Sequence, residues 1–404
     1  MPLPEKHFRL APHVVVGIPS RNEAATIGGV VVAAVEGLRR CGLAERSVLI
    51  NADNGSMDGT PEVFASAAGG FPHRCMNAPP VETGKGTNVL GILRTANLWG
   101  ARRVVLLDAD VHTVEPAWIG LLLRAVDIEA PAMAAPIYRR NRIEGNTTNH
   151  IASPLIGAAF GVHVEQPVAG DFAFNRAFVH QSEAWPIPRS AHLYGIDIHL
   201  TAHAAREGLR IVQVPLGRKI HNPGFPKILF GSQQVIDSLF HAIAHQRELI
   251  PRSTGVRQRR ETVDLQISRP DPALVAETVA KALRYLDAEE ASITEMFPSV
   301  RDSPGAGWGL HIDTDTWAQV LADALEALAA GHGTQARDHL VALYLSRVMT
   351  YWTQIDGLEP AAIDEILDHQ GVAIAAAVQA RGIRFDSPFQ TLEFEPGYWA
   401  QDMP

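Results

Sequence analysis

The chain has 404 residues, of which 46% are hydrophobic and 20% charged, and its formal net charge is −9 at pH 7. This composition is ordinary for a soluble globular protein, and the negative charge argues against a general nucleic-acid-binding protein. With only two cysteines, a disulfide framework is not expected and a reducing compartment, the cytoplasm, is favoured. Residues 1–10 lack the apolar core of a signal peptide, and no apolar run reaches the roughly 18 residues of a membrane span.

The first part of the chain alternates short apolar runs with helical segments. A short unbroken apolar run indicates a strand that is buried on both faces, as in a parallel sheet. We predict strands at 13–18, 47–50 and 104–107 and helices at 24–40, 61–68 and 88–98. This βαβα order predicts an α/β fold with a right-handed, mostly parallel, Rossmann-like sheet.

The middle of the chain is less regular. We predict strands at 133–138 and 211–215, a turn into a short strand at 166–174, and helices at 150–160 and 194–207. The composition changes at a basic connector, 252–260. Beyond it, apolar residues at helical spacing predict helices at 272–288, 316–330, 335–355 and 360–381. We therefore predict an α/β domain over 1–250 and a helical domain over 251–404, which packs on the first domain or forms an oligomer contact.

The tripeptide Asp108-Ala109-Asp110 follows the predicted strand at 104–107 directly. In open α/β sheets, ligands bind at the carboxyl ends of the strands. Alternate residues of an extended segment share a side, so we expect Asp108 and Asp110 to point the same way. Two such oxygen ligands suit Mg²⁺ or Mn²⁺, which in turn bind diphosphate oxygens. The alternative is that the two acids only end a strand in solvent.

Two further loops carry groups that suit a nucleotide. Arg21-Asn22-Glu23 and Asp53 follow the first two predicted strands, where carboxylates can accept hydrogen bonds from a base or a ribose. Gly84-Lys85-Gly86 combines a positive charge with glycines that let a ligand approach the backbone, but it lacks the Walker spacing. Each loop also has a simpler interpretation. Asn22 or Glu23 could cap the following helix, Asp53 could belong to a tight turn, and Lys85 could be a solvated residue of a flexible turn.

Together these motifs resemble a known family. Their order and spacing are similar to those of the GT-A glycosyltransferases, which have a Rossmann-like catalytic domain. The segments 166–171 (Gln-Pro-Val-Ala-Gly-Asp) and 194–197 (Tyr-Gly-Ile-Asp), with His221 after the last strand, resemble the mannosylglycerate synthase and glucosyl-3-phosphoglycerate synthase families. These are retaining, metal-dependent enzymes with a helical C-terminal part. The resemblance covers about residues 13–225.

The resemblance implies roles for individual residues. It implies a nucleoside pocket formed by Pro19, Arg21, Glu23 and Asp53. It implies contacts with the diphosphate, ribose or donor sugar by Lys85, Asp108, Ala109, Gly170 and Asp171, with Asp171 standing where the family has a Glu. It implies a metal ion held by Asp110 and His221, with Asp108 against it. It implies an acceptor site formed by Arg140, Thr148 and Asp197, and it makes Asp197 and Lys85 the catalytic candidates.

Each of these later residues also has a simpler interpretation. His221 could be a surface residue beside a proline turn, although imidazole is a common ligand of Mn²⁺-type sites. Asp197 could cap the helix that it opens. The run containing Arg139, Arg140 and Arg142 could be a solvated basic turn, although a forked guanidinium suits a small carboxylate or phosphate.

These features predict a hexosyltransferase that uses Mg²⁺ or Mn²⁺, and the resemblance implies that it retains the anomeric configuration. The donor would be a nucleoside-diphosphate hexose of the UDP-glucose or GDP-mannose type, and the acceptor a small hydroxy acid such as glycerate or 3-phosphoglycerate. We predict a homodimer with no nucleic-acid or membrane partner. No residue is a secure nucleophile, which favours same-face attack. The alternatives are a specialised-metabolite acceptor, a sugar-phosphate nucleotidyltransferase and a catalytically idle sugar-nucleotide-binding protein.

Overall fold

The computed structural model describes residues 11–77, 84–141, 143–222, 224–246, 248–250, 270–301, 311–385 and 398–399. Arg142 and the predicted connector at 252–260 lie outside them. The chain divides into two compact units. The first unit comprises Met1–Tyr138 and Val168–Asn222, and the second comprises Arg139–Pro167 and Pro223–Pro404.

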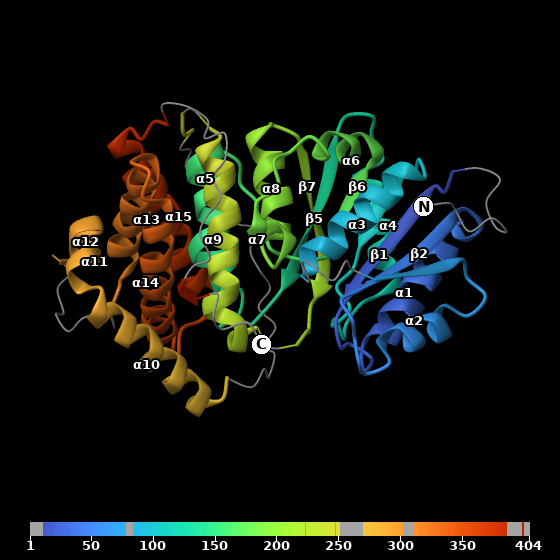
Figure 1. Cartoon of the computed structure of the whole chain (residues 1–404), viewed down its shortest axis with the longest axis horizontal. Helices are drawn as coiled ribbons and strands as arrows, with labels where there is room; N and C mark the ends of the chain where they lie inside the picture. The colour runs from blue at the N-terminus through green and yellow to red at the C-terminus, as the bar shows by residue number, and fades with distance from the viewer. Residues whose placement is uncertain are drawn as a thin grey trace. The chain divides into compact units, whose positions relative to one another are not determined.

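A seven-stranded sheet forms the centre of the first unit, in the order β3-β2-β1-β4-β6-β5-β7 (Figure 1). The strands are β1 (Val14–Ser20), β2 (Ser47–Asp53), β3 (His73–Asn77), β4 (Arg103–Leu106), β5 (Ala132–Arg139), β6 (Ala173–Asn175) and β7 (Arg210–Arg218). β1 pairs in parallel with β2 and β4, and β2 pairs in parallel with β3. β6 is antiparallel to β4 and β5. The predicted α/β class is confirmed, with a mixed sheet whose first four strands are parallel.

The burial of the strands explains which of them the sequence reveals. Every residue of β1 and of β2 is buried, as their apolar runs predict. β3 was not predicted, because its sequence His-Arg-Cys-Met-Asn is half-exposed and has no apolar run. β3 is an edge strand, and a strand in that position can remain polar.

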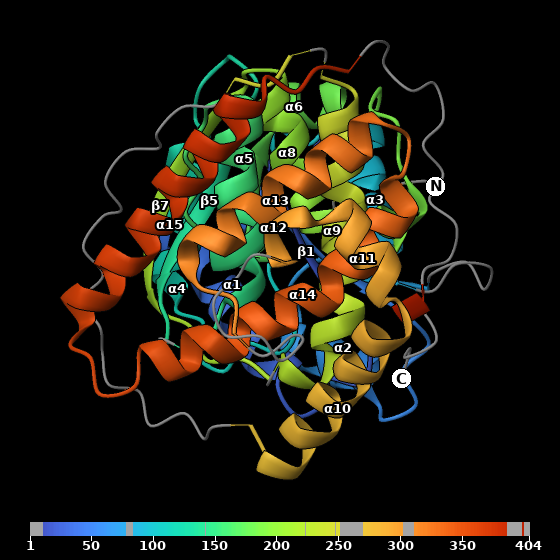
Figure 2. The ribbon, with the colours of Figure 1, turned by 90° about the vertical axis from the view of Figure 1, so that its left-hand side faces the viewer.

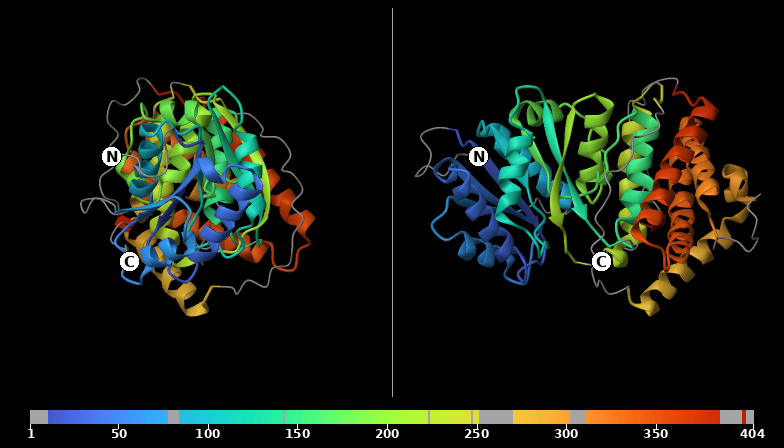
Figure 3. Two further views of the ribbon diagram at one scale, coloured as in Figure 1. Left: turned by 90° about the vertical axis from the view of Figure 1, so that its right-hand side faces the viewer. Right: turned by 180° about the vertical axis from the view of Figure 1, so that it is seen from behind.

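The helices of the first unit form two layers against the sheet (Figure 1, Figure 3). One layer contains α1 (Ile27–Arg40), α2 (Thr60–Ala68) and α4 (Pro116–Ala125). The other contains α3 (Lys85–Leu98), α6 (Arg176–Ser182), α7 (Arg189–His192) and α8 (Ile196–Arg206). α3 begins at Lys85 rather than at the predicted Asn88, so Lys85 lies in the first turn of a helix instead of in a loop.

The second unit is a group of helices. After the π-turn η2 (Thr148–Ala152) they are α5 (Ser153–Phe160), α9 (Ile228–Ala244), α10 (Pro272–Ala288), α11 (Glu290–Met296), α12 (Pro298–Arg301), α13 (Thr314–Ala329), α14 (Gly333–Gln354) and α15 (Pro360–Arg381). α13 packs against both α14 and α15 (Figure 2). The four helices predicted after residue 270 are confirmed. Among the described residues, no helix is long and apolar enough to cross a membrane.

The division of the chain differs from the predicted boundary near residue 250. All eight residues of α5 are buried, and so are nearly all residues of α9. A helix that is buried all round must be covered on several sides. Within the second unit α15 packs on α5 and α14 packs on α9, so the segment 139–167 and α9 group with the C-terminal helices.

Candidate functional site

The carboxyl ends of the central parallel strands meet at one edge of the sheet in the first unit. Ser20 pairs with Asp53 in the register of β1 and β2, and β4 lies on the other side of β1. β4 ends at Leu106, two residues before Asp108, and Ala109 and Asp110 form a turn. The extended geometry from which we expected Asp108 and Asp110 to share a side is therefore absent.

Lys85 lies between two of the predicted carboxylates. Its Nζ atom is 2.8 Å from Asp108 Oδ1 and 2.9 Å from Asp197 Oδ2. Asp197 is the second residue of α8 and makes no capping bond there, so its interpretation as a helix cap is wrong. The three residues come from the start of α3, the turn after β4 and the start of α8, and the fold brings them together across 112 positions of sequence.

A second lysine, which sequence reasoning missed, completes this cluster. Lys219 Nζ lies 2.6 Å from Asp171 Oδ2 and 3.1 Å from Asp108 Oδ2. The same ammonium donates to the carbonyl of Ala169 at 2.7 Å and stands 5.1 Å from the centre of the Tyr138 ring. Only 3% of the Lys219 side chain is exposed. A lysine at this depth must have charged or polar partners, and the partners named here belong to the first unit.

Asp171 organises the buried side of the cluster. Its Oδ1 accepts the backbone N–H of Asp108 at 2.9 Å, and its Oδ2 accepts the Tyr138 hydroxyl at 2.6 Å as well as Lys219. Asp171 has no exposed surface. Its observed contacts therefore hold Lys219 and the backbone of Asp108, and its contact with a donor sugar stays a prediction.

Gly170 lets this arrangement close. Its φ of +85° is a conformation that L side chains rarely adopt, and a Cβ built on it would lie 1.8 Å from Asp108 Oδ2. Any side chain at position 170 would displace the Asp108 carboxylate. The turn before β6 is thus in direct contact with the turn after β4.

The charges of the cluster shift its pKa values in opposite directions. Burial disfavours ionised Asp108, but Lys85 and Lys219 hold the pKa of that carboxyl well below its usual range. Burial also works against the charge of Lys85, yet Asp108 and Asp197 keep its pKa well above the ordinary value. Burial and the nearby Asp108 charge raise the pKa values of both Asp110 and Asp197. Four carboxylates face two ammonium groups, so the cluster carries a formal negative charge that one divalent cation would neutralise.

Of the predicted metal ligands, Asp110 and His221 fit a metal site, and Asp108 does not. Both oxygens of Asp108 are occupied by lysines, and no group of three His, Cys, Asp or Glu side chains in the described ranges could hold a metal ion. Asp110 makes no hydrogen bond or ion pair with any described residue, although it is partly buried. The His112 N–H donates to Ile220 O at 2.8 Å, which ties the turn of Asp110 to the segment of His221. A carboxylate and an imidazole are a donor set that suits Mn²⁺ or Mg²⁺ when a diphosphate supplies the remaining oxygens.

The two loops predicted to bind the nucleoside are joined to each other. The backbone N–H groups of Asn22, Glu23 and Ala24 donate to side-chain oxygens of Ser56, Thr60 and Asp58. Asn22 has a φ of 55°, which is uncommon outside glycine. Pro19 is buried and Arg21 is exposed, and the Glu23 carboxylate accepts a bond from Asn222 at 3.1 Å.

Asp53 has a structural role in the same loops. Only 2% of Asp53 is exposed, and its oxygens accept bonds from Ser20 Oγ, Ser56 Oγ and the Ser56 N–H at 2.6–2.9 Å. These contacts form the tight turn that was the alternative interpretation of this residue. A further contact with a base or ribose stays a prediction.

The residues predicted to bind the acceptor are divided between the two units. Asp197 belongs to the first unit, whereas Arg140 and Thr148 belong to the second. Arg140 is partly buried. Thr148 is 5% exposed, opens the π-turn η2, and its hydroxyl makes no hydrogen bond to the described residues.

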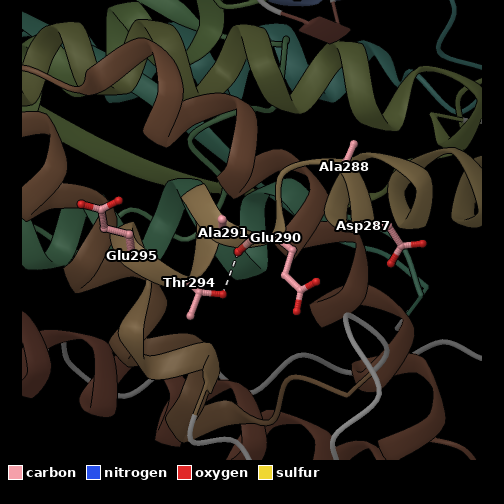
Figure 4. A pocket seen from close by; sticks show the side chains of 6 residues that line it. All are labelled: Asp287, Ala288, Glu290, Ala291, Thr294 and Glu295. Carbon is pink, nitrogen blue, oxygen red and sulfur yellow. Dashed lines mark hydrogen bonds between the residues drawn. The ribbon is translucent and has the colours of Figure 1, made fainter.

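A separate hollow lies in the second unit where α10 meets α11 (Figure 4). It has a volume of about 720 Å³ and is lined by Asp287, Ala288, Glu290, Ala291, Thr294 and Glu295. The Thr294 hydroxyl donates to the carbonyl of Glu290, within its own helix. None of the predicted site residues lines this hollow.

The fold and the cluster define an α/β protein whose charged site lies at the carboxyl edge of a Rossmann-like sheet. The chain is similar to crystal structures of glucosyl-3-phosphoglycerate synthase from Mycobacterium tuberculosis. The structure in complex with phosphoglyceric acid has 25% sequence identity and a TM-score of 0.47, over 57% of this chain and 80% of that chain. The structure in complex with Mn²⁺, uridine-diphosphate-glucose and phosphoglyceric acid has 26% identity and the same TM-score and coverage. No family model and no curated protein matches the sequence.

Proposed function

We propose that this chain is a metal-dependent, retaining hexosyltransferase that moves a hexose from a nucleoside-diphosphate sugar to a small hydroxy acid. The observation that carries the proposal is Lys85, held at 2.8 Å and 2.9 Å from Asp108 and Asp197 in the first turn of a 14-residue helix. A helix N-terminus and a lysine together favour a phosphate group. Both lie at the carboxyl edge of the sheet, where open α/β folds bind nucleotides.

The metal would be held by Asp110 and His221. Asp110 is partly buried and makes no hydrogen bond or ion pair with a described residue, so its oxygens are available to a ligand. A divalent ion held there would supply positive charge against the leaving diphosphate. Lys85 adds a second positive charge on the same group, and Lys219 keeps Asp108 ionised and fixed beside it.

The acceptor would be a small acid. Arg140 would supply a forked cation, and Thr148 would supply a hydroxyl in the first turn of a helical segment that begins at Asn146. Asp197 would accept a hydrogen bond from a sugar or acceptor hydroxyl. Because Asp197 is paired with Lys85 and Asp171 has no exposed surface, neither is presented as a nucleophile, which favours same-face attack with the departing phosphate as base.

A product assay tests the proposal. The protein is incubated with Mg²⁺ or Mn²⁺ and with pairs drawn from UDP and GDP hexoses and from glycerate-like acids, and the products are identified by mass. We expect one hexose to be added to an acid, with release of the nucleoside diphosphate only when metal is present. Formation of a sugar nucleotide from a nucleoside triphosphate, or the absence of any sugar transfer, would contradict the proposal.

A further inference from the structure

The start of α5 has an unusual turn. The N–H of Ser153 bonds to the carbonyl of Thr148, five residues earlier, and this bond makes η2 a π-turn. Pro154 follows in the first turn of α5 and has no N–H. The carbonyls of Asn149 and His150 therefore lose their ordinary helical donors. Buried carbonyls without a donor are costly, so other groups must supply the missing bonds.

Side chains of the C-terminal helices supply both bonds. Gln370 of α15 donates through Nε2 to the carbonyl of Asn149 at 2.9 Å. Trp317 of α13 donates through Nε1 to the carbonyl of His150 at 2.8 Å. Both side chains are fully buried. The π-turn is thus completed by residues 167 and 221 positions away in sequence.

Gln370 is itself fixed by a buried arginine. Arg347 of α14 donates through Nε to Gln370 Oε1 at 3.1 Å, which assigns that amide atom as the oxygen. The same oxygen lies 3.0 Å from His150 Nδ1, so Nδ1 is the ring nitrogen that carries hydrogen. The His150 ring packs edge-on against Tyr351, with 4.6 Å between ring centres. Neither Gln370 nor His150 can turn without breaking this network.

The residues before the turn are held in the same way. The Tyr344 hydroxyl of α14 lies 3.0 Å from Thr147 Oγ1, and Trp352 Nε1 donates to Asn146 Oδ1 at 3.3 Å. Ile143 packs on an apolar cluster from the end of α14 and from α15, which contains Tyr351, Ile355, Ile363 and Leu367. Side chains of α13, α14 and α15 therefore contact the segment 143–150 along most of its length.

We propose that the C-terminal helices position the acceptor-binding turn, with Gln370 and Trp317 as the positioning residues for Thr148. The inference rests on the proposed function, because it takes Thr148 as a contact of the acceptor acid. Correct placement of a hydroxyl within a fraction of an ångström governs how well it binds a small anion. The helical part of the chain thus has a role in acceptor recognition, and this role does not depend on any group of the donor site.

Three variants test this inference by steady-state kinetics with each substrate varied in turn. Gln370→Met removes the three hydrogen bonds of the amide, to Asn149, Arg347 and His150, while keeping the length of the side chain. Tyr344→Phe removes the hydroxyl that faces Thr147. Val378→Ala is the control, because it makes a small cavity in a buried position of α15 two turns beyond Gln370. We expect the acceptor KM to rise about tenfold in Gln370→Met and about threefold in Tyr344→Phe. The donor KM should stay within twofold in both, and the control should lower only the melting temperature.

The outcomes separate this inference from the proposed function. If wild-type protein transfers no sugar to any acid, the proposed function fails and this inference fails with it. If the wild type is active and both variants keep the wild-type acceptor KM, only this inference is overturned. It is also overturned if the KM values for donor and acceptor rise together and Val378→Ala behaves in the same way. Should Gln370→Met fail to fold, Tyr344→Phe decides, because it removes a single hydroxyl and keeps the ring.

Discussion

Lys219 and Asp171 form an ion pair of 2.6 Å in which neither side chain is more than 3% exposed. The ammonium of Lys219 also contacts Asp108, so it neutralises two carboxylates that would otherwise repel each other. A buried charge that loses its partner destabilises a protein strongly, even where the intact pair contributes little. The cluster is therefore a structural element of the first unit as well as a part of the proposed site.

Replacing Lys219 with methionine should lower the stability of the protein and also release the side chains of Asp108 and Asp171 that Lys219 holds. We expect Lys219→Met to cost about 3–5 kcal/mol in the free energy of unfolding, because the buried Asp171 then loses its ammonium partner and only Asp108 keeps one, in Lys85. Urea unfolding measures this cost. Arg218→Met, at the exposed neighbouring position, is the control and should change stability by less than about 0.5 kcal/mol. An equal effect of the two substitutions would show that the Lys219 ion pairs do not stabilise the fold.

The metal site should depend on Asp110 and His221. Asp110→Ala or His221→Ala should weaken Mn²⁺ binding in the presence of nucleoside diphosphate by more than tenfold, since each removes one of the two proposed protein ligands. Electron paramagnetic resonance of free Mn²⁺ measures this binding directly. His112→Ala, at an exposed histidine of the same turn, is the control and should bind like wild type. Unchanged Mn²⁺ binding in both ligand variants would exclude these residues as ligands.

The loops that we propose to bind the nucleoside provide a third prediction. Asp53 holds Ser20 and Ser56, so Asp53→Asn keeps much of the turn but removes the negative charge. We expect affinity for the nucleoside diphosphate to fall about three- to tenfold, with little change in kcat, because a base or ribose contact is shared by ground and transition states. Calorimetric titration measures the affinity. A variant that binds as tightly as wild type would leave Asp53 with the role of a turn residue alone.

A buried histidine in the second unit predicts how stability depends on pH. His339 lies 2.9 Å from the Tyr285 hydroxyl and 2.8 Å from Ser292 Oγ, and burial lowers its pKa from 6.5 to about 4. The unfolded chain therefore binds a proton at a higher pH than the folded chain. The stability contributed by neutral His339 is complete above about pH 6.5 and is lost as pH falls towards 4.

His339→Gln removes this titration while retaining groups that can form hydrogen bonds. Between pH 7 and pH 4, the wild type should lose on the order of 2–3 kcal/mol more stability than the variant. Chemical unfolding at several pH values measures the difference. Parallel stability curves for the two proteins would show that His339 does not titrate between these limits.

The sequence predicts the parallel core of the sheet and part of the site for one physical reason. The runs that form β1, β2 and β4 are apolar because they are buried on both faces, and polar groups appear where each strand ends. The sequence indicates Lys85 because two glycines flank it, and it indicates Asp108 because this residue directly follows the apolar run of β4. The resemblance, rather than the local pattern, pointed to Asp197, which the fold does bring to Lys85.

Other features depend on distant partners and leave no local signal. Lys219 follows an ordinary strand end, and its ion pairs span 111 and 48 positions of sequence. β3 is polar because it lies at an edge. Residues 139–167 group with the second unit because they pack on α13–α15. No change in composition marks where the chain leaves the first unit or where it comes back to it at Val168.

The central claim is that the first unit binds a nucleoside diphosphate through a divalent ion and Lys85. Calorimetric titration of UDP and of GDP into the wild type and into Lys85→Met, each with and without Mn²⁺, tests it most directly. We predict that one of the two nucleotides binds the wild type only when Mn²⁺ is present, and that Lys85→Met weakens this binding at least tenfold. Absence of binding by either nucleotide, or binding that depends neither on Mn²⁺ nor on Lys85, would contradict the claim.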